Sequence, residues 1–282
     1  MTCALYLVAT PIGNLSDISA RAAQTLSDVD FIAAEDTRVT LKLLRHLDIK
    51  KQLISYHEHN RRESGERIIS RLQSGESCAL VTDAGTPGIS DPGEELVRMC
   101  VESKIPVIAI PGPCAAIAAL AVSGLPAGRF TFEGFLSTAR KNRFERLSEL
   151  KTEKRTMIFY EAPHKLMRTL GDMLTVFGER RVAISRELTK LYEETLRFTL
   201  SEAISHFGQM PPRGELVLII EGTEKDSPAE IDISQAAAIV KTYVDGGMSV
   251  KDAVKKAAEE TGVPKNALYN AAIQIVPSSP DP

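Results

Sequence analysis

The sequence predicts an α/β protein with two α/β domains, residues 1–123 and 129–222, and a small helical extension over residues 229–282. Along the first domain, short apolar runs alternate with helical patterns, which is typical of a mostly parallel sheet with helices on both faces. Segment 123–128, SGLPAG, is a glycine- and proline-containing linker to a second set of strands and helices. The last part of the chain has helical patterns alone.

The composition is that of an ordinary soluble globular protein. The chain has 282 residues, 43% hydrophobic and 25% charged, and a net charge of −3, so contacts with nucleic acid would need local basic patches. Its cysteines (Cys3, Cys78, Cys100 and Cys114) are far apart and form no CxxC motif, which argues against a zinc site or a disulfide framework. Because we find neither a signal peptide nor an apolar run of about 20 residues, we predict a cytoplasmic protein without a membrane partner.

The first domain contains five predicted strands, with helices between them. The strands cover residues 4–9, 30–34, 52–56, 78–82 and 105–110. Ser16 or Asp17 can cap the first helix, and Asn60 with Glu63 has the pattern of a capping box for the third. After the fifth strand, the small side chains of helix 115–122 allow close packing.

The second domain also contains five predicted strands. They cover residues 130–135, 156–161, 182–186, 195–200 and 215–221. Helices lie between the first three, and we predict that the last two form an antiparallel pair. In the extension, helices over 249–261 and 264–275 are joined by a short turn, as in a helix-turn-helix. A helical hairpin that packs on the rest of the protein or on a partner subunit is the alternative.

Segment 80–93, LVTDAGTPGISDPG, is the strongest candidate for a binding site. It begins as a buried strand and then breaks into a loop whose glycines allow close backbone approach and whose prolines fix its shape. Asp83 lies where the strand ends, and ligands of open α/β sheets bind at the carboxyl ends of strands. The sequence contains neither GxGxxG nor GxxxxGK[ST], so a pyrophosphate site is not expected, whereas a nucleoside without phosphate remains possible.

Polar residues also follow the second strand. Asp36 or Thr37 can simply cap the next helix. Alternatively, Glu35 or Asp36 accepts a proton and Arg38 binds a substrate phosphate. His57 and His59 lack a third ligand, so we expect no metal.

A basic run begins near residue 140. Such a run is usually the solvated face of a helix, but beside a catalytic cleft it can follow a phosphate backbone. The run contains Arg140, Lys141, Arg143, Arg146, Lys151, Lys154 and Arg155.

Several segments together resemble one family from end to end. The chain is similar to the bacterial enzymes that methylate the ribose 2'-oxygen of a cytidine in the small-subunit (16S) ribosomal RNA, which belong to the tetrapyrrole methylase superfamily. The matching segments are LYLVATPIGNL (5–15), AAEDTR (33–38), DAGTP (83–87), DPG (91–93), PGPCAA (111–116), EGFL (133–136), FYE (159–161) with His164, RELTK (186–190), GE (214–215) and NALY (266–269).

The resemblance implies two α/β domains of the tetrapyrrole methylase type, with S-adenosyl-L-methionine bound in the cleft between them. It also implies a homodimer that acts on small-subunit ribosomal RNA or on the assembled small subunit, and not on DNA, and RNA contact by the C-terminal helices. The cofactor positions of the superfamily fall on Pro11, Ile12, Gly13, Asp83, Gly85, Thr86, Cys114, Ala115, Tyr160, Glu161, Leu188, Glu215 and Leu216.

A ribose hydroxyl is a poor nucleophile, so transfer needs a base or a strong hydrogen-bond acceptor. Glu35, Asp36, Glu187 and His57 are available, and we favour the Glu35–Asp36 pair. The residues predicted to contact RNA are Arg38, Arg140, Lys141, Arg143, Arg186 and Lys265. Two other functions remain open, namely methylation of a tetrapyrrole carbon by the same fold and a non-enzymatic RNA-binding assembly factor.

Overall fold

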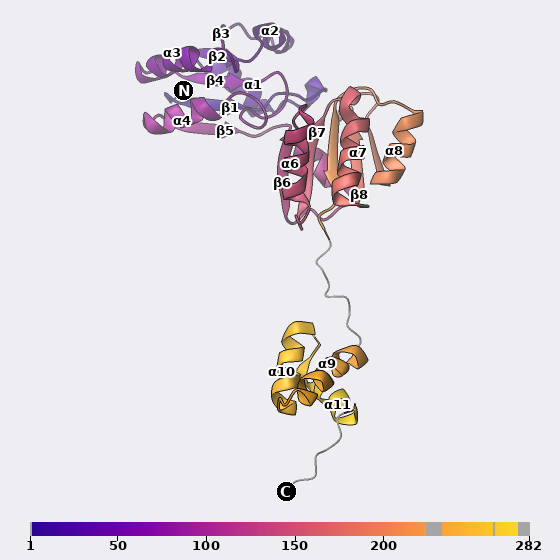
Figure 1. Ribbon diagram of the computed structural model, residues 1–282. Coiled ribbons are helices and arrows are strands. Elements are labelled where there is room, and N and C mark those ends of the chain that lie inside the picture. Colours follow the sequence, from indigo (N-terminus) through magenta and orange to yellow (C-terminus); the bar gives the residue numbers. More distant parts are fainter. Residues whose placement is uncertain (1, 224–232, 262, 276–282) are drawn as a thin grey trace. The chain divides into compact units, whose positions relative to one another are not determined.

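The computed structural model describes residues 2–223, 233–261 and 263–275. The chain divides into two compact units, Met1–Gly222 and Thr223–Pro282, and most of their elements are labelled in Figure 1. The first unit contains two five-stranded sheets.

The first sheet is entirely parallel and has the strand order β3-β2-β4-β1-β5. Helices α1 and α2 cover one face, and α3 and α4 cover the other, which explains why most strands are near-continuous apolar runs. The strands are β1 (Leu5–Val8), β2 (Phe31–Ala34), β3 (Gln52–Ser55), β4 (Cys78–Val81) and β5 (Val107–Ile110). The helices are α1 (Ala20–Asp28), α2 (Thr37–His46), α3 (Arg61–Gln73) and α4 (Glu94–Glu102).

Two predicted helix starts are wrong in detail. Helix α1 is capped by Ser19, whose hydroxyl accepts from the Ala22 N–H at 3.0 Å, whereas Ser16 and Asp17 belong to a preceding 3-10 turn. Asn60 does precede α3, but its side chain makes no capping bond.

The Asn60 side chain instead closes the turn after β3. Its Oδ1 accepts from the His57 N–H at 2.9 Å, and its Nδ2 donates to the Ser55 carbonyl at 3.1 Å. Asn side chains commonly bond nearby backbone groups in this way, and at this turn that bonding competes with the predicted capping box.

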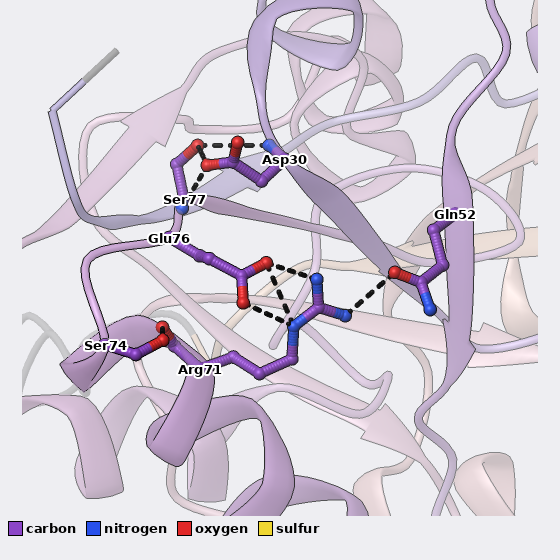
Figure 2. Close-up of polar contacts among 6 residues, drawn as sticks. All are labelled: Asp30, Gln52, Arg71, Ser74, Glu76 and Ser77. Atoms are coloured by element: carbon purple, nitrogen blue, oxygen red, sulfur yellow. Dashed lines mark hydrogen bonds and ion pairs between the residues drawn. The ribbon is translucent and has the colours of Figure 1, made fainter.

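The amino ends of three strands in the first sheet are tied together by polar contacts (Figure 2). The Asp30 carboxylate accepts from both the N–H and the hydroxyl of Ser77, each at 2.7 Å, and these bonds lower the pKa of Asp30. Arg71 pairs with Glu76 and donates to Gln52 at 3.1 Å. These contacts fix the amino ends of the strands. The opposite, carboxyl ends are where α/β sheets place the loops of a binding site.

The second sheet is mixed and has the order β6-β7-β10-β8-β9. Its strands are β6 (Phe130–Phe135), β7 (Thr156–Glu161), β8 (Arg181–Arg186), β9 (Glu194–Thr199) and β10 (Leu216–Ile220). The predicted antiparallel pairing of the last two strands is wrong. Strand β10 pairs antiparallel with β7 and β8, and β9 pairs antiparallel with β8 at the edge. All of β10 is buried, as a central strand should be, whereas β9 is only partly covered.

Helices cover both faces of the second sheet. On one face lie α6 (Arg140–Leu150), α7 (Leu166–Phe177) and α8 (Leu200–Gln209), of which the first two are neighbours in Figure 1. On the other lies α5 (Ala115–Ser123), which belongs to the range predicted for the first domain but packs against the second sheet. Its small side chains permit that close contact.

The position of Arg143 disagrees with its predicted contact with RNA. Its side chain is 2% exposed, donates to Asp172 at 2.7 Å and to the Ser137 and Thr138 carbonyls, and therefore lies in the interior between α6 and α7. A guanidinium so enclosed does not reach a phosphate, so its place in the basic run reflects folding and not RNA binding.

The described residues of the second unit form a three-helix cluster. It consists of α9 (Ile233–Asp245), α10 (Val250–Thr261) and α11 (Lys265–Ile275) around a core of small and branched side chains. The helices predicted over 249–261 and 264–275 agree with α10 and α11, while 229–232 and 276–282 lie outside the described residues. None of the described helices has the length and apolar character needed to cross a membrane.

Candidate active site

A cavity of about 400 Å³ is present in the first unit, lined by residues from both sheets. It lies where β2 and β4 end, and it is completed by residues from the end of β7, the β8–β9 loop and the start of β10. The predicted site residues that line it are Ile12, Glu35, Asp83, Gly85, Thr86, Cys114, Ala115, Tyr160, Glu161, Glu187, Leu188, Glu215 and Leu216. The predicted residues Pro11, Gly13 and Asp36 are not among the lining residues.

Three loops of the first sheet are joined at the cavity. The Thr10 N–H donates to the Gly85 carbonyl at 2.9 Å, and the Gly85 N–H donates to the Thr10 carbonyl at 3.1 Å. Gly85 has φ +84°, a conformation that favours glycine. The Thr86 hydroxyl donates to the Pro113 carbonyl at 3.1 Å. The loops after β1, β4 and β5 therefore form one rigid wall.

The second sheet supplies a fixed aromatic ring and a buried carboxylate. The Tyr160 hydroxyl accepts from the Ala116 N–H at 3.2 Å, and burial raises the Tyr160 pKa to about 12, so this phenol stays neutral. Glu161 is 4% exposed and accepts from the Ala162 N–H at 2.9 Å and from the Thr169 hydroxyl at 2.5 Å. Those bonds commit Glu161 to holding the turn after β7.

The β8–β9 loop brings Glu187 and Lys190 to the cavity. Their side chains pair at 3.0 Å, and the Glu187 backbone has φ +51°, which is uncommon outside glycine. A Cβ on Gly214 would lie 1.9 Å from the Glu187 carboxylate, and a Cβ on Gly13 would lie 2.6 Å from Lys190 Cγ. Gly13, although it does not line the cavity, makes room for a side chain that does.

Gly13→Ala is therefore expected to weaken cofactor binding by about fivefold, because a displaced Lys190 loses its pairing with Glu187. Calorimetric titration with S-adenosylhomocysteine measures the effect. Gly128→Ala is the matched control, since a Cβ there meets nothing within 4 Å. Equal affinities of the two variants would show that the space at Gly13 has no part in the site.

The Glu35 and Asp83 side chains link the carboxyl ends of β2 and β4. The Asp83 N–H donates to the Glu35 carboxylate at 3.2 Å, and the Asp36 N–H donates to Asp83 at 3.1 Å. Burial raises the pKa of both carboxyls, and their proximity to each other raises that of Glu35 further. The cavity therefore concentrates negative charge that a bound cation would neutralise.

Asp91 is a site residue to which sequence reasoning gave no role. Burial first, and then the negative charges of Glu35, Asp83 and Glu215, raise its pKa to about 6. It lines the cavity, and no hydrogen bond or ion pair to it is found among the described residues. The preceding Ser90 has φ +67°. The sequence feature that could have indicated Asp91 is the motif DPG, because a turn that only connects two elements does not need a buried aspartate.

Asp36 and Arg38 form a separate unit at the start of α2. Asp36 caps the helix through the Arg38 N–H at 2.8 Å and also binds the Arg38 guanidinium. That guanidinium lowers the Asp36 pKa to about 2, which makes this carboxylate a weak base. The Arg38 side chain is 85% exposed. The capping interpretation of Asp36 is confirmed.

The cavity lining does not include the predicted RNA contacts Arg140, Lys141 and Arg186. Arg186 pairs with Glu194 at 2.6 Å, and Arg140 and Lys141 are exposed on α6. Lys265 is exposed on α11 in the second unit. The lining residues that sequence reasoning did not select are Ala84, Ile89, Ser90, Asp91, Phe135, Ala162, Pro163, Lys190 and Val217.

Two family models match the chain. The model described as Tetrapyrrole (Corrin/Porphyrin) Methylases matches residues 4–204, and the RsmI C-terminal HTH domain matches residues 236–275.

Solved structures with the same fold include uroporphyrin-III-C-methyltransferase from Thermus thermophilus (TM-score 0.54, 19% identity, 76% of this chain and 93% of that chain). Another is the methyltransferase CobJ (TM-score 0.58, 16% identity, 78% and 94%). The Thermus thermophilus enzyme has also been solved in complex with S-adenyl homocysteine (TM-score 0.54, 16% identity, 77% and 97%). At these identities the likeness concerns the fold, and the predicted fold class is confirmed.

Much closer relatives exist among curated proteins that are named Ribosomal RNA small subunit methyltransferase I. That of Halalkalibacterium halodurans is 51% identical, over 94% of this chain and 93% of its own length. Those of Synechocystis sp. and Pseudomonas aeruginosa are each 48% identical, over 96% of this chain and 98% and 96% of their lengths. The chain belongs to the ribosomal RNA small subunit methyltransferase I family of the tetrapyrrole methylases.

Proposed function

We propose that this protein transfers a methyl group from S-adenosylmethionine to the ribose 2'-oxygen of a cytidine in small-subunit ribosomal RNA. Its family makes it a methyltransferase that uses S-adenosylmethionine. The observation that carries the proposal for this chain is the cavity in which carboxylates and apolar side chains of both sheets meet.

The residues of the cavity fit the cofactor. S-adenosylmethionine carries a sulfonium and an ammonium, and the lining carboxylates Glu35, Asp83, Asp91 and Glu215 favour positive charge. The apolar surface of Leu188 and its neighbours suits an adenosine without a phosphate chain, as does the absence of a phosphate-binding motif from the sequence. We propose that the predicted cofactor residues lining the cavity hold this ligand.

The charges disfavour a tetrapyrrole as the substrate. Lys190 is the one lysine or arginine among the described residues that line the cavity, and it is paired with Glu187. A tetrapyrrole precursor carries many carboxylates, which would meet like charges in this cavity without enough arginines to bind them. An RNA phosphate backbone can instead remain outside, on exposed residues such as Arg38, Arg140 and Lys141.

The chain has to align the acceptor oxygen and remove its proton. The bound cofactor supplies an activated methyl carbon, so alignment of the oxygen about 3 Å from it gives much of the acceleration. Asp91 suits the proton acceptor, because a pKa of about 6 leaves it ionised at neutral pH yet more basic than an ordinary carboxylate. Glu35 is already bonded to the Asp83 N–H, and Asp36 is paired with Arg38, so both are weaker candidates.

The proposed function also includes RNA binding by the C-terminal helices and a homodimeric state. The helix-turn-helix unit of residues 236–275 would bind ribosomal RNA, with Lys265 exposed at the start of α11. We also propose that the protein acts as a homodimer, on either free RNA or the assembled small subunit.

The test is methyl transfer from labelled cofactor to small subunits and to free ribosomal RNA, both taken from a strain that lacks this activity. Digestion to nucleosides and mass analysis should then give 2'-O-methylcytidine, with no label in subunits from the parent strain, whose site is already methylated. Cofactor binding without label in RNA would overturn the substrate, and label in a base or at another nucleoside would overturn the acceptor atom.

A further inference from the structure

We propose that Phe135 is the aromatic platform on which a nucleobase of the RNA stacks when the acceptor ribose enters the cavity. The inference deepens the proposed function and rests on it. Phe135 lines the cavity, yet the residue is 59% exposed. Covering an exposed apolar ring removes its surface from water, which is favourable, so a ring at the mouth of a binding cavity is suited to contact a ligand.

The backbone of β6 is shaped to place this ring. Phe132 and Phe135 are three residues apart, so regular alternation would point them to opposite faces of the sheet. The pairing of β6 with β7 shifts between Phe132 and Gly134, and Gly134 has φ +62°. As a result both phenyl rings contact Tyr160, at centroid distances of 5.2 Å and 5.5 Å. Bulges beside active sites commonly re-aim a side chain in this way.

The platform is rigid. Tyr160, which both rings meet edge-on, is itself held by the Ala116 N–H. A Cβ on Gly134 would lie 3.4 Å from the Ser90 hydroxyl, so the bulge lies close to the loop that carries Asp91. Phe135 and the proposed proton acceptor Asp91 thus line the same cavity from two neighbouring segments.

A nucleobase is the occupant that the surroundings favour. Proteins that recognise unpaired RNA stack bases on exposed aromatic rings beside positive charges. Helix α6, which follows β6 in the chain, begins with the exposed Arg140 and Lys141. Two other occupants, the adenine of the cofactor and a second copy of this chain, give different results in the test below.

Phe135→Ala should raise the KM for RNA by about 5- to 150-fold, the range that corresponds to truncation of a base-stacking residue. The affinity for S-adenosylhomocysteine and the oligomeric state should not change. Phe135→Tyr should retain the wild-type KM, because it keeps a stacking ring. The matched control is Phe130→Ala, which removes an exposed ring of the same strand that does not line the cavity.

Three results would overturn the inference. They are an unchanged KM for RNA in Phe135→Ala, an equal loss in Phe130→Ala, and a loss of cofactor affinity or of dimer that accounts for the whole effect. Each requires a wild-type protein that methylates RNA. If the wild type itself transfers no methyl group to RNA, the proposed function fails first, and the two failures are thereby distinguished.

Discussion

Asp91→Asn is expected to lower kcat for methyl transfer by about 100- to 10,000-fold, the range that general-base catalysis contributes. Asparagine keeps the size of the side chain but cannot take the proton of the 2'-hydroxyl. Binding of S-adenosylhomocysteine should persist, because Glu35, Asp83 and Glu215 remain in the cavity. Single-turnover transfer to small subunits and calorimetric titration separate the two effects.

The pH dependence of the wild type tests the same assignment. The pKa of Asp91, raised to about 6 in the free protein, predicts that kcat/KM falls as the pH drops through 6, because the carboxyl becomes protonated and can no longer accept the proton. Glu35→Gln distinguishes the neighbouring carboxyl. If Glu35→Gln abolishes transfer while Asp91→Asn keeps it, the proton acceptor is Glu35.

The Asp91→Asn variant, although less active, should be more stable than the wild type at pH 8. In the folded protein the pKa of Asp91 is about 6, against an ordinary value of 3.8, so protonated Asp91 favours folding. That contribution is complete below pH 3.8 and is lost as the pH rises through 6. After allowance for its partial exposure, removing the charge should stabilise the variant by about 1 kcal/mol at pH 8, or about 2–4 °C in Tm.

Thermal unfolding at pH 8 and at pH 4 measures this difference, and the gain should be absent at pH 4. The exposed Asp28→Asn on α1 is the control and should change neither activity nor Tm. A variant that is inactive and also less stable at pH 8 would mean that Asp91 supports the fold and not the reaction.

The loops that line the cavity could be predicted from the sequence because each is a short, continuous motif. Glycines and prolines fix the chain locally, and the ends of parallel strands bring such loops to one edge. The segment around Gly85 is found where it was expected, joined to Thr10. Asp91 was not selected from the sequence because its burial and the charges of Glu35 and Glu215, which come from distant parts of the chain, distinguish it only in the folded protein.

The strand order of the second sheet could not be predicted either, because it depends on contacts between segments that are distant in the chain. Strands β9 and β10 are separated in the chain by one helix, α8, and their local patterns do not record which neighbours each will have. The all-apolar β10 (LVLII) is completely buried as a central strand, whereas β9 (ETLRFT), which carries polar residues, is partly exposed at the edge. Pairing between distant strands is decided by tertiary packing, which local preferences do not contain.

Arg143 is a single residue whose position in the fold could likewise not be predicted from the local sequence. Within the run 140–155 it resembles its neighbours, but in the structure it is enclosed and paired with Asp172 at 2.7 Å. Arg143→Ala should reduce the free energy of unfolding by about 3 kcal/mol, because it leaves a largely buried carboxylate without its partner. For a unit of this size the Tm should fall by about 6–12 °C.

Lys141→Ala is the matched control, because this side chain is 85% exposed and makes only a 3.9 Å contact with Glu145. It should leave the Tm nearly unchanged. The double variant Arg143→Met, Asp172→Leu should recover much of the lost stability, since replacing both members of a buried pair by apolar residues removes the unpaired charge. An unchanged Tm in Arg143→Ala together with a raised KM for RNA would instead return Arg143 to the RNA-binding surface, and would require its side chain to leave Asp172 when RNA binds.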